Sequence, residues 1–120
     1  MRGRFHGKAI KRRVPGQMSS LEKAYAEHLE TRIISGEIER YDFEPEKFRL
    51  ADKTFYTPDF RLVYPDQRIE FHEVKGSWSA PNQDMSRVKI KVAAEMHPYQ
   101  FVAITRESKK NGGRWIREEF

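Results

Sequence analysis

The sequence contains no cysteine, which excludes disulfide bonds and thiolate metal sites and is typical of proteins in a reducing cytoplasm. It also lacks any apolar run approaching the ~20 residues that a membrane-spanning helix needs. No apolar stretch follows the basic N-terminal residues, so the sequence predicts no signal peptide. We therefore expect a protein without a membrane segment that works in the cytoplasm.

Acidic residues are absent from residues 1–17, although the chain as a whole contains 18 of them. The same segment carries a concentration of basic residues, while the rest of the chain is close to neutral. Its glycines and proline are typical of a flexible arm, and basic arms commonly contact nucleic acid. A tail that only improves solubility is the alternative interpretation. The basic residues of the arm are Arg2, Arg4, Lys8, Lys11, Arg12 and Arg13.

Residues 18–120 are enough for one domain with a single core. A helix between two strands is the usual crossover that joins parallel strands. We therefore predict an α/β domain with a central mixed sheet flanked by helices. The expected elements are a helix from Ser19 to about Ser35, extended segments over Ile38–Leu50, a hairpin over Asp59–Lys75, a helix from Pro81 to about Met96, a strand over Gln100–Thr105 and an edge strand over Arg114–Phe120.

Both expected helices have an apolar stripe at helical spacing, which predicts the face that packs on the sheet. Gly36 follows the first helix and Pro98 follows the second, as expected for helix ends. The stripe of the first helix is Leu21, Tyr25, Leu29 and Ile33, and that of the second is Met85, Val88, Val92 and Met96.

The hairpin has a testable register. Side chains alternate along a strand, and directly opposed residues of an antiparallel pair lie on the same face. If Val63 lies opposite Ile69, Asp59 lies opposite Glu73, and the connecting loop has an ordinary length. A shift by one residue would turn Glu73 to the other face.

This register brings two carboxylates and the Lys75 ammonium to one point. Carboxylate oxygens bind hard divalent cations, and a lysine beside such a cation can orient water or stabilise charge on a phosphate. An exposed edge strand with polar side chains is the alternative interpretation of Glu73 and Lys75. His72 alternates to the opposite face and is interpreted as a packed or hydrogen-bonded histidine.

Pro58-Asp59 and Glu73-Val74-Lys75 resemble the signature of the PD-(D/E)xK nuclease superfamily, which includes restriction endonucleases and junction resolvases. The resemblance extends over four blocks, which are similar to a small phage-associated nuclease-like family: Ser19–Glu22, Phe43–Glu46, Tyr56–Phe60 and His72–Gly76. It implies a restriction-endonuclease-like core over residues 18–120.

The resemblance also implies a role for each matched residue. Asp59, Glu73 and the Val74 carbonyl would hold Mg²⁺ or Mn²⁺, and Lys75 would activate or position the attacking water. Glu22 matches a further acidic residue that many members bring to the metal. Ser19-x-x-Glu22 is equally the pattern of a helix capping box, so Glu22 has two interpretations.

The resemblance implies a metal-dependent DNA endonuclease, encoded by a phage, acting in the infected bacterial cytoplasm on junction or branched DNA. Arg87 and Lys91 share a face of the second helix and match a position that often contacts phosphate; a solvated helix face is the alternative. Small members often form dimers, so a homodimer is one expectation, and other phage proteins are further expected partners. The alternative functions are a non-catalytic nucleic-acid-binding module and a phage packaging accessory.

Overall fold

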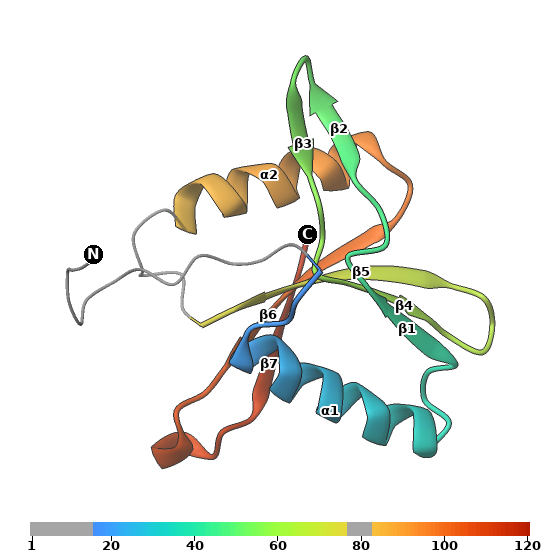
Figure 1. Cartoon of the computed structure of the whole chain (residues 1–120), viewed down its shortest axis with the longest axis vertical. Coiled ribbons are helices and arrows are strands. Elements are labelled where there is room, and N and C mark those ends of the chain that lie inside the picture. The colour runs from blue at the N-terminus through green and yellow to red at the C-terminus, as the bar shows by residue number, and fades with distance from the viewer. Residues whose placement is uncertain (1–15, 77–82) are drawn as a thin grey trace, which may run out of the picture.

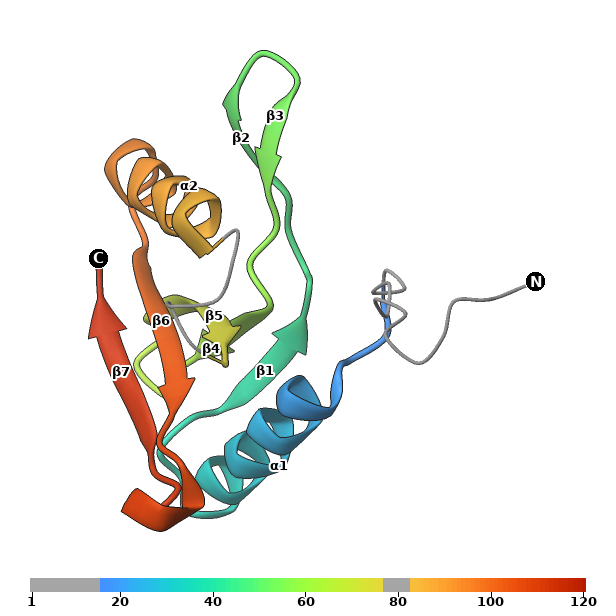
Figure 2. The same cartoon turned by 90° about the vertical axis from the view of Figure 1, so that its left-hand side faces the viewer.

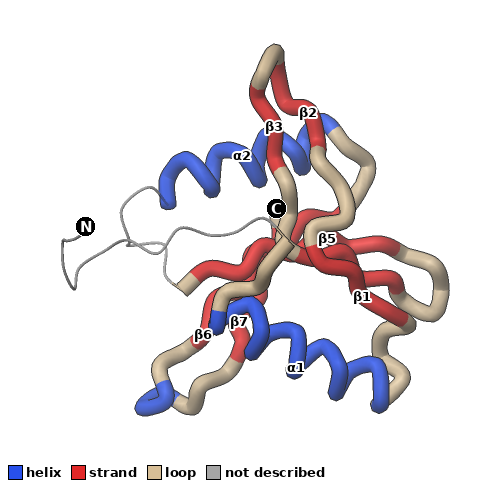
Figure 3. Tube along the Cα trace, viewed as in Figure 1, coloured by secondary structure: helices blue, strands red, loops and turns tan. Residues whose placement is uncertain are grey.

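The fold was analysed in a computed structural model, which describes residues 16–76 and 83–120. Helices, strands and loops alternate along the chain as Figures 1 and 3 show. The elements are α1 (Ser20–Ile34), β1 (Arg40–Phe43), β2 (Phe48–Ala51), β3 (Thr54–Tyr56), β4 (Phe60–Val63), β5 (Ile69–Lys75), α2 (Gln83–Met96), β6 (Gln100–Arg106), the short 3₁₀ helix η1 (Lys109–Asn111) and β7 (Trp115–Glu119).

Five strands form a central sheet in the order β1-β4-β5-β6-β7. β5 and β6 run parallel and are connected through α2, whereas the other neighbouring pairs are antiparallel. The two helices lie on opposite sides of this sheet, as Figures 1 and 2 show. The predicted fold class, an α/β domain with a mixed sheet between helices, is confirmed.

The alternation of side chains divides the core into two clusters. On the α1 side, Tyr25 and Leu29 of the helix pack against Phe60, Leu62 and other buried strand residues. On the α2 side, the helix packs against aromatic side chains of β5 and β6. Residues of even number on β5 therefore face α1, and residues of odd number face α2.

The hairpin register is the one that the sequence predicts. Val63 pairs with Ile69, and Phe60, the first residue of β4, pairs with His72. Continued by one residue, this register sets Asp59 opposite Glu73. The geometric condition for the predicted site is met.

α1 begins and ends as its sequence predicts. The Ser19 hydroxyl accepts the Glu22 amide, and the Glu22 carboxylate accepts the Ser19 amide, so the capping box is present. At the other end Gly36 adopts a left-handed conformation with φ of 83°, and its amide bonds to the Ile33 carbonyl. Tyr25 and Leu29 of the predicted stripe are fully buried.

The predicted buried face of α2 is wrong. Met85 and Val88 are 63% and 54% exposed, and Met96 is also exposed, whereas Ile90 and Ala93 are completely buried. Large aromatic rings line the sheet surface below α2, and Ile90 and Ala93 pack against them. Helix α2 carries apolar residues on two faces, and Met85, Val88 and Met96 lie on the exposed one. Pro81, the predicted start, lies outside the described residues.

β2 and β3 form a separate two-stranded ribbon that projects from the body of the domain (Figures 1 and 2). The side chains of Phe48 and Tyr56 turn inward and join the core cluster beneath α2. The ribbon is therefore anchored at its base. Within the described part of the chain, no helix is long and apolar enough to cross a membrane.

Candidate active site

Asp59 and Glu73 meet where the β4–β5 pairing ends. Beyond Phe60 the two strands no longer pair, and the Asp59 side chain takes over from the backbone: its Oδ2 accepts the Val74 amide at 2.8 Å. Both carboxyl groups are buried. The hydrogen bond to the Val74 amide therefore fixes Asp59 at the end of the β4–β5 pairing.

Glu73 is held from two sides. The Tyr56 hydroxyl donates to Oε1 at 3.0 Å, and the Lys75 ammonium lies 3.3 Å from Oε2. Burial, together with the charge of Glu73, raises the pKa of Tyr56 well above its usual value, so the phenol remains a donor. The sequence prediction missed Tyr56, although it stands three residues before Asp59.

Lys75 is oriented by a second contact that the sequence prediction also missed. Its ammonium donates to the Ser86 hydroxyl of α2 at 3.0 Å. Ser86 lies four residues before Ile90 and seven before Ala93, so the three share the buried helix face. The spacing Ser86, Ile90, Ala93 is the signal in the sequence that would have identified this face.

The acidic side chains of Glu73 and Glu22 lie close to Asp59. Burial raises the pKa of Asp59 to about 9, the charges of Glu73 and Glu22 add to this effect, and the Val74 amide opposes it. An ordinary buried carboxylate of a protein core has a cationic or donor group to compensate it. In this group of acids, the Lys75 ammonium contacts Glu73.

Glu22 caps α1 as one interpretation of the sequence predicts, and its role at a metal stays a prediction. Its Oε1 accepts the Ser19 amide at 2.8 Å, which is the capping bond. The same buried carboxyl group also forms a side-chain contact with Asp59 that raises the pKa of Asp59. The first turn of α1 therefore brings a third acid to the site while the helix remains capped.

The donor set consists of carboxylate oxygens, which suit Mg²⁺ or Mn²⁺. Within residues 16–76 and 83–120, no three or more His, Asp or Glu side chains are arranged as a metal-binding group. The fit therefore concerns the pair Asp59 and Glu73, whose mutual repulsion a cation would relieve. Glu22 is committed on one oxygen to the helix cap.

The residues predicted to contact DNA have different surroundings in the structure. Arg87 forms a bidentate ion pair with Glu118 of β7 and lies over the Phe120 ring, so α2 is tied to the last strand through it. Lys91 is exposed and lines a shallow groove with Ala94 and Phe120. The basic residues of the arm, Arg2, Arg4, Lys8, Lys11, Arg12 and Arg13, lie outside the described residues.

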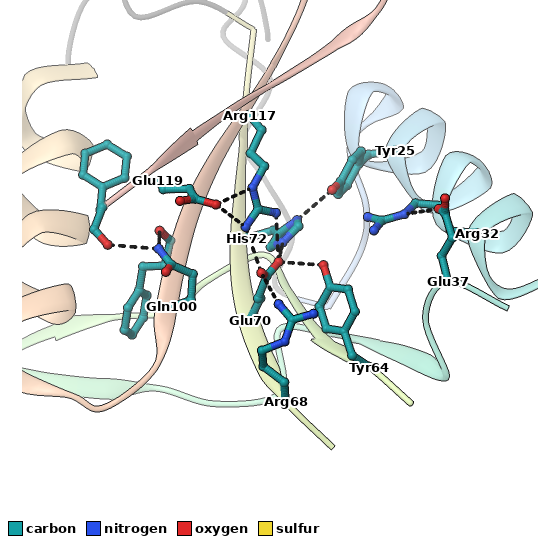
Figure 4. Close-up of polar contacts among 12 residues, drawn as sticks. Tyr25, Arg32, Glu37, Tyr64, Arg68, Glu70, His72, Gln100, Arg117 and Glu119 are labelled. Carbon is teal, nitrogen blue, oxygen red and sulfur yellow. Dashed lines mark hydrogen bonds and ion pairs between the residues drawn. The ribbon is translucent and has the colours of Figure 1, made fainter. Parts of the chain in front are cut away.

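A second buried polar cluster, which we call the Glu70 cluster, lies on the α1 face of the sheet (Figure 4). Burial alone would raise the pKa of Glu70, but hydrogen bonds from its neighbours outweigh this and hold the pKa well below its usual range. Arg117 of β7 makes a bidentate contact at 2.9 and 2.8 Å. The four donors to Glu70 are Tyr64, Arg68, His72 and Arg117.

His72 extends this cluster to α1. Burial lowers the pKa of His72, so the ring is neutral; its Nε2–H donates to Glu70 and its Nδ1 accepts the Tyr25 hydroxyl at 2.7 Å. The prediction that His72 is a packed, hydrogen-bonded histidine is confirmed. The sequence analysis did not single out Glu70, whose partners come from distant segments.

The chain was compared with known proteins. No protein-family model, no curated protein and no solved structure matches it.

Proposed function

We propose that this protein is a metal-dependent DNA endonuclease of the PD-(D/E)xK type. The observation that carries the proposal is the meeting of the buried Asp59 and Glu73 carboxylates with the Lys75 ammonium at the end of one hairpin. A protein core gains nothing from such a cluster, because buried like charges destabilise the fold. Phosphodiester hydrolysis uses acidic oxygens and an ammonium in this combination.

Asp59, Glu73 and the carbonyl of Val74 would hold Mg²⁺ or Mn²⁺, and Glu22 is a further candidate ligand. Bound there, the cation would lower the pKa of water and neutralise charge on the phosphate. The donor chemistry supports this assignment, since both carboxylates are hard oxygen donors.

The remaining roles belong to side chains of the protein. Lys75 would orient the attacking water or stabilise the charge that develops on the phosphate. Ser86 fixes the direction of the Lys75 ammonium, and Tyr56 fixes the Glu73 carboxylate. Water adds across the P–O3′ bond, which leaves a 5′-phosphate and a 3′-hydroxyl.

The proposed substrate is junction or branched DNA in a phage-infected bacterial cell. The described residues form a five-stranded sheet, a two-stranded ribbon and the helices packed on them, and a domain of this size favours recognition of DNA shape over recognition of a long sequence. The arm over residues 1–17 would supply phosphate contacts, with Arg87 and Lys91 as further candidates. A homodimer would supply one site for each strand.

A cleavage assay on duplex, nicked, flapped and four-way DNA, with Mg²⁺, Mn²⁺ or a chelator, tests this function. Lys75→Ala should lower the cleavage rate ~10²–10⁴-fold, the scale of one general base or electrostatic stabiliser. DNA binding should be nearly unchanged. Lys110→Ala is the matched control, because Lys110 is exposed on η1 and outside the site.

The outcomes separate the candidate functions. Cleavage that requires metal and Lys75 supports the nuclease. DNA binding without cleavage under any of these metals would favour the non-catalytic binding module, and the absence of both would favour a packaging accessory. Wild-type cleavage by Lys75→Ala would show that the assigned site is wrong.

A further inference from the structure

The β2–β3 ribbon has two chemically different faces. Phe48 and Tyr56 pair across the strands and turn into the core beneath α2. Arg49 and Phe55, the next pair, lie on the opposite face and are exposed. Lys47 joins this outer face, with its ammonium 4.6 Å above the centre of the Phe55 ring.

The turn of the ribbon adds a further cation. Lys53 is exposed at the tip and has a left-handed φ of 54°. One exposed acid, Asp52, stands beside it. The projecting surface is therefore basic and aromatic, a combination that suits a phosphate backbone with its bases.

Arg49 differs from the other arginines that the structure describes, and the lysines on either side of it are equally unpaired, as are Lys23, Lys89, Lys91, Lys109 and Lys110 elsewhere on the described surface. Lys47, Arg49 and Lys53 form no ion pair with any residue that the structure describes. Arg106 is occupied by the Gly113 carbonyl and the Trp115 ring. The other described arginines each have a carboxylate partner: Arg32, Arg40, Arg61, Arg68, Arg87, Arg114 and Arg117.

The basic arm enters the described fold at the base of this ribbon. The Gly16 amide donates to the Glu44 carboxylate at 3.1 Å, and Glu44 stands four residues before β2 begins. All six basic residues of the arm precede Gly16 in the sequence. The last residues of the basic arm and the base of the ribbon therefore lie next to each other at Gly16 and Glu44.

The ribbon is also connected directly to the candidate active site. Phe55 lies on the outer face, and the next residue, Tyr56, donates from the inner face to Glu73. Asp59 follows three residues later. A duplex held by the outer face would lie against the segment that carries two site residues.

We propose that the outer face and tip of the β2–β3 ribbon form a binding site for duplex DNA. A two-stranded ribbon has the width that the major groove of B-form DNA admits, and the three cations would neutralise flanking phosphates. Phe55 would contact the sugar or base edges between them. This inference rests on the proposed function in one respect, the identity of the ligand as DNA.

The test is the salt dependence of DNA binding in the presence of a chelator, which prevents metal-dependent cleavage. The variant Lys47→Gln/Arg49→Gln/Lys53→Gln removes the three charges and keeps a polar, unbranched side chain at each position. Lys23→Gln/Lys109→Gln/Lys110→Gln is the matched control, with the same change in net charge at three other exposed positions. Melting temperatures of both variants establish that the fold is intact.

The ribbon variant should bind a plain duplex at least about tenfold more weakly at low salt, and the slope of log K against log salt should flatten by about 2–3 units, since each phosphate contact contributes ~0.9. In the control variant, the affinity for DNA and the slope of log K against log salt should change clearly less. Equal slopes and affinities for the two variants would overturn the inference, as would a wild-type chain that binds no DNA.

Failure of this inference is distinguishable from failure of the proposed function. If the protein cleaves DNA with metal, and the ribbon variant binds DNA as the control variant does, the ribbon site is overturned and the proposed nuclease function stands. Binding that requires the ribbon, in a chain that cleaves no DNA with Mg²⁺ or Mn²⁺, would support the ribbon site and overturn the nuclease.

Discussion

Asp59 and Glu70 are buried to nearly the same extent, with 2% and 1% of their surfaces exposed, yet their surroundings are opposite. Glu70 accepts hydrogen bonds from two arginines, a tyrosine and a histidine, and its pKa is held well below the usual range. Asp59 accepts the Val74 amide and lies beside the carboxyl groups of Glu73 and Glu22, and its pKa is raised to about 9.

We interpret the difference as that between a structural carboxylate and one proposed to serve function. The Glu70 cluster joins β5, β7 and α1 through Arg117, His72 and Tyr25, and its charge is compensated inside the protein. The Asp59 site brings acidic groups together in a buried place, which is costly for folding and would be useful for holding a cation. Perturbed carboxyl groups are concentrated at functional sites for this reason.

Glu70→Gln should give the largest loss of stability. The amide nitrogen of Gln would face a donor, and Arg117 would lose its carboxylate partner. We expect the free energy of unfolding to fall by about 3 kcal/mol. Denaturant unfolding at neutral pH measures this, with the exposed Glu27→Gln on α1 as control. A loss no larger than that of the control would contradict the structural role of the cluster.

Glu22→Gln tests whether the third acid serves the site or only the helix. Glutamine keeps the capping box, so the melting temperature should stay close to that of the wild type. Cleavage should fall roughly 10–100-fold, the usual cost of losing a group that supports a metal ligand. Unchanged turnover together with an unchanged melting temperature would leave Glu22 as a helix cap alone.

The pH dependence of stability gives the smallest effect. The folded-state pKa of Glu70 is lowered, so its contribution is complete above the pKa of an unfolded-state Glu, about 4.3, and is lost as pH falls below that value. The stability difference between wild type and Glu70→Gln should therefore narrow below about pH 4.5, by at most ~1.4 kcal/mol per pH unit. Urea unfolding at pH 7, 5, 4 and 3 would reveal it; a constant difference would contradict the assigned pKa.

The sequence was sufficient for features that depend on local periodicity. Alternation along the hairpin fixes the register, and with it the opposition of Asp59 and Glu73. The Ser19 and Glu22 spacing predicts how α1 begins. In both cases a short segment contains all the information needed.

Features that depend on distant segments were missed. The buried face of α2 was misassigned because its apolar residues lie on two faces, and only packing against the sheet decides that Ile90 and Ala93 face inward. The contact between Ser86 and Lys75 depends on that same choice of face. Glu70 draws its partners from β5, β7 and the β4–β5 turn, which no single stretch of sequence brings together.

The stability of Asp59→Asn, measured with a chelator and again with Mn²⁺, tests the central claim most directly. Asparagine can still accept the Val74 amide and is neutral in both states, whereas folding at neutral pH must keep the Asp59 carboxyl group protonated, because its pKa is raised to about 9. The account predicts that this variant is more stable than wild type in chelator, by about 1–3 kcal/mol. It also predicts that Mn²⁺ stabilises the wild type and does not stabilise Asp59→Asn. The control Asp52→Asn, which changes an exposed aspartate of the ribbon turn, should respond to Mn²⁺ as the wild type does. A loss of stability like that of Glu70→Gln, unaffected by Mn²⁺, would contradict the account.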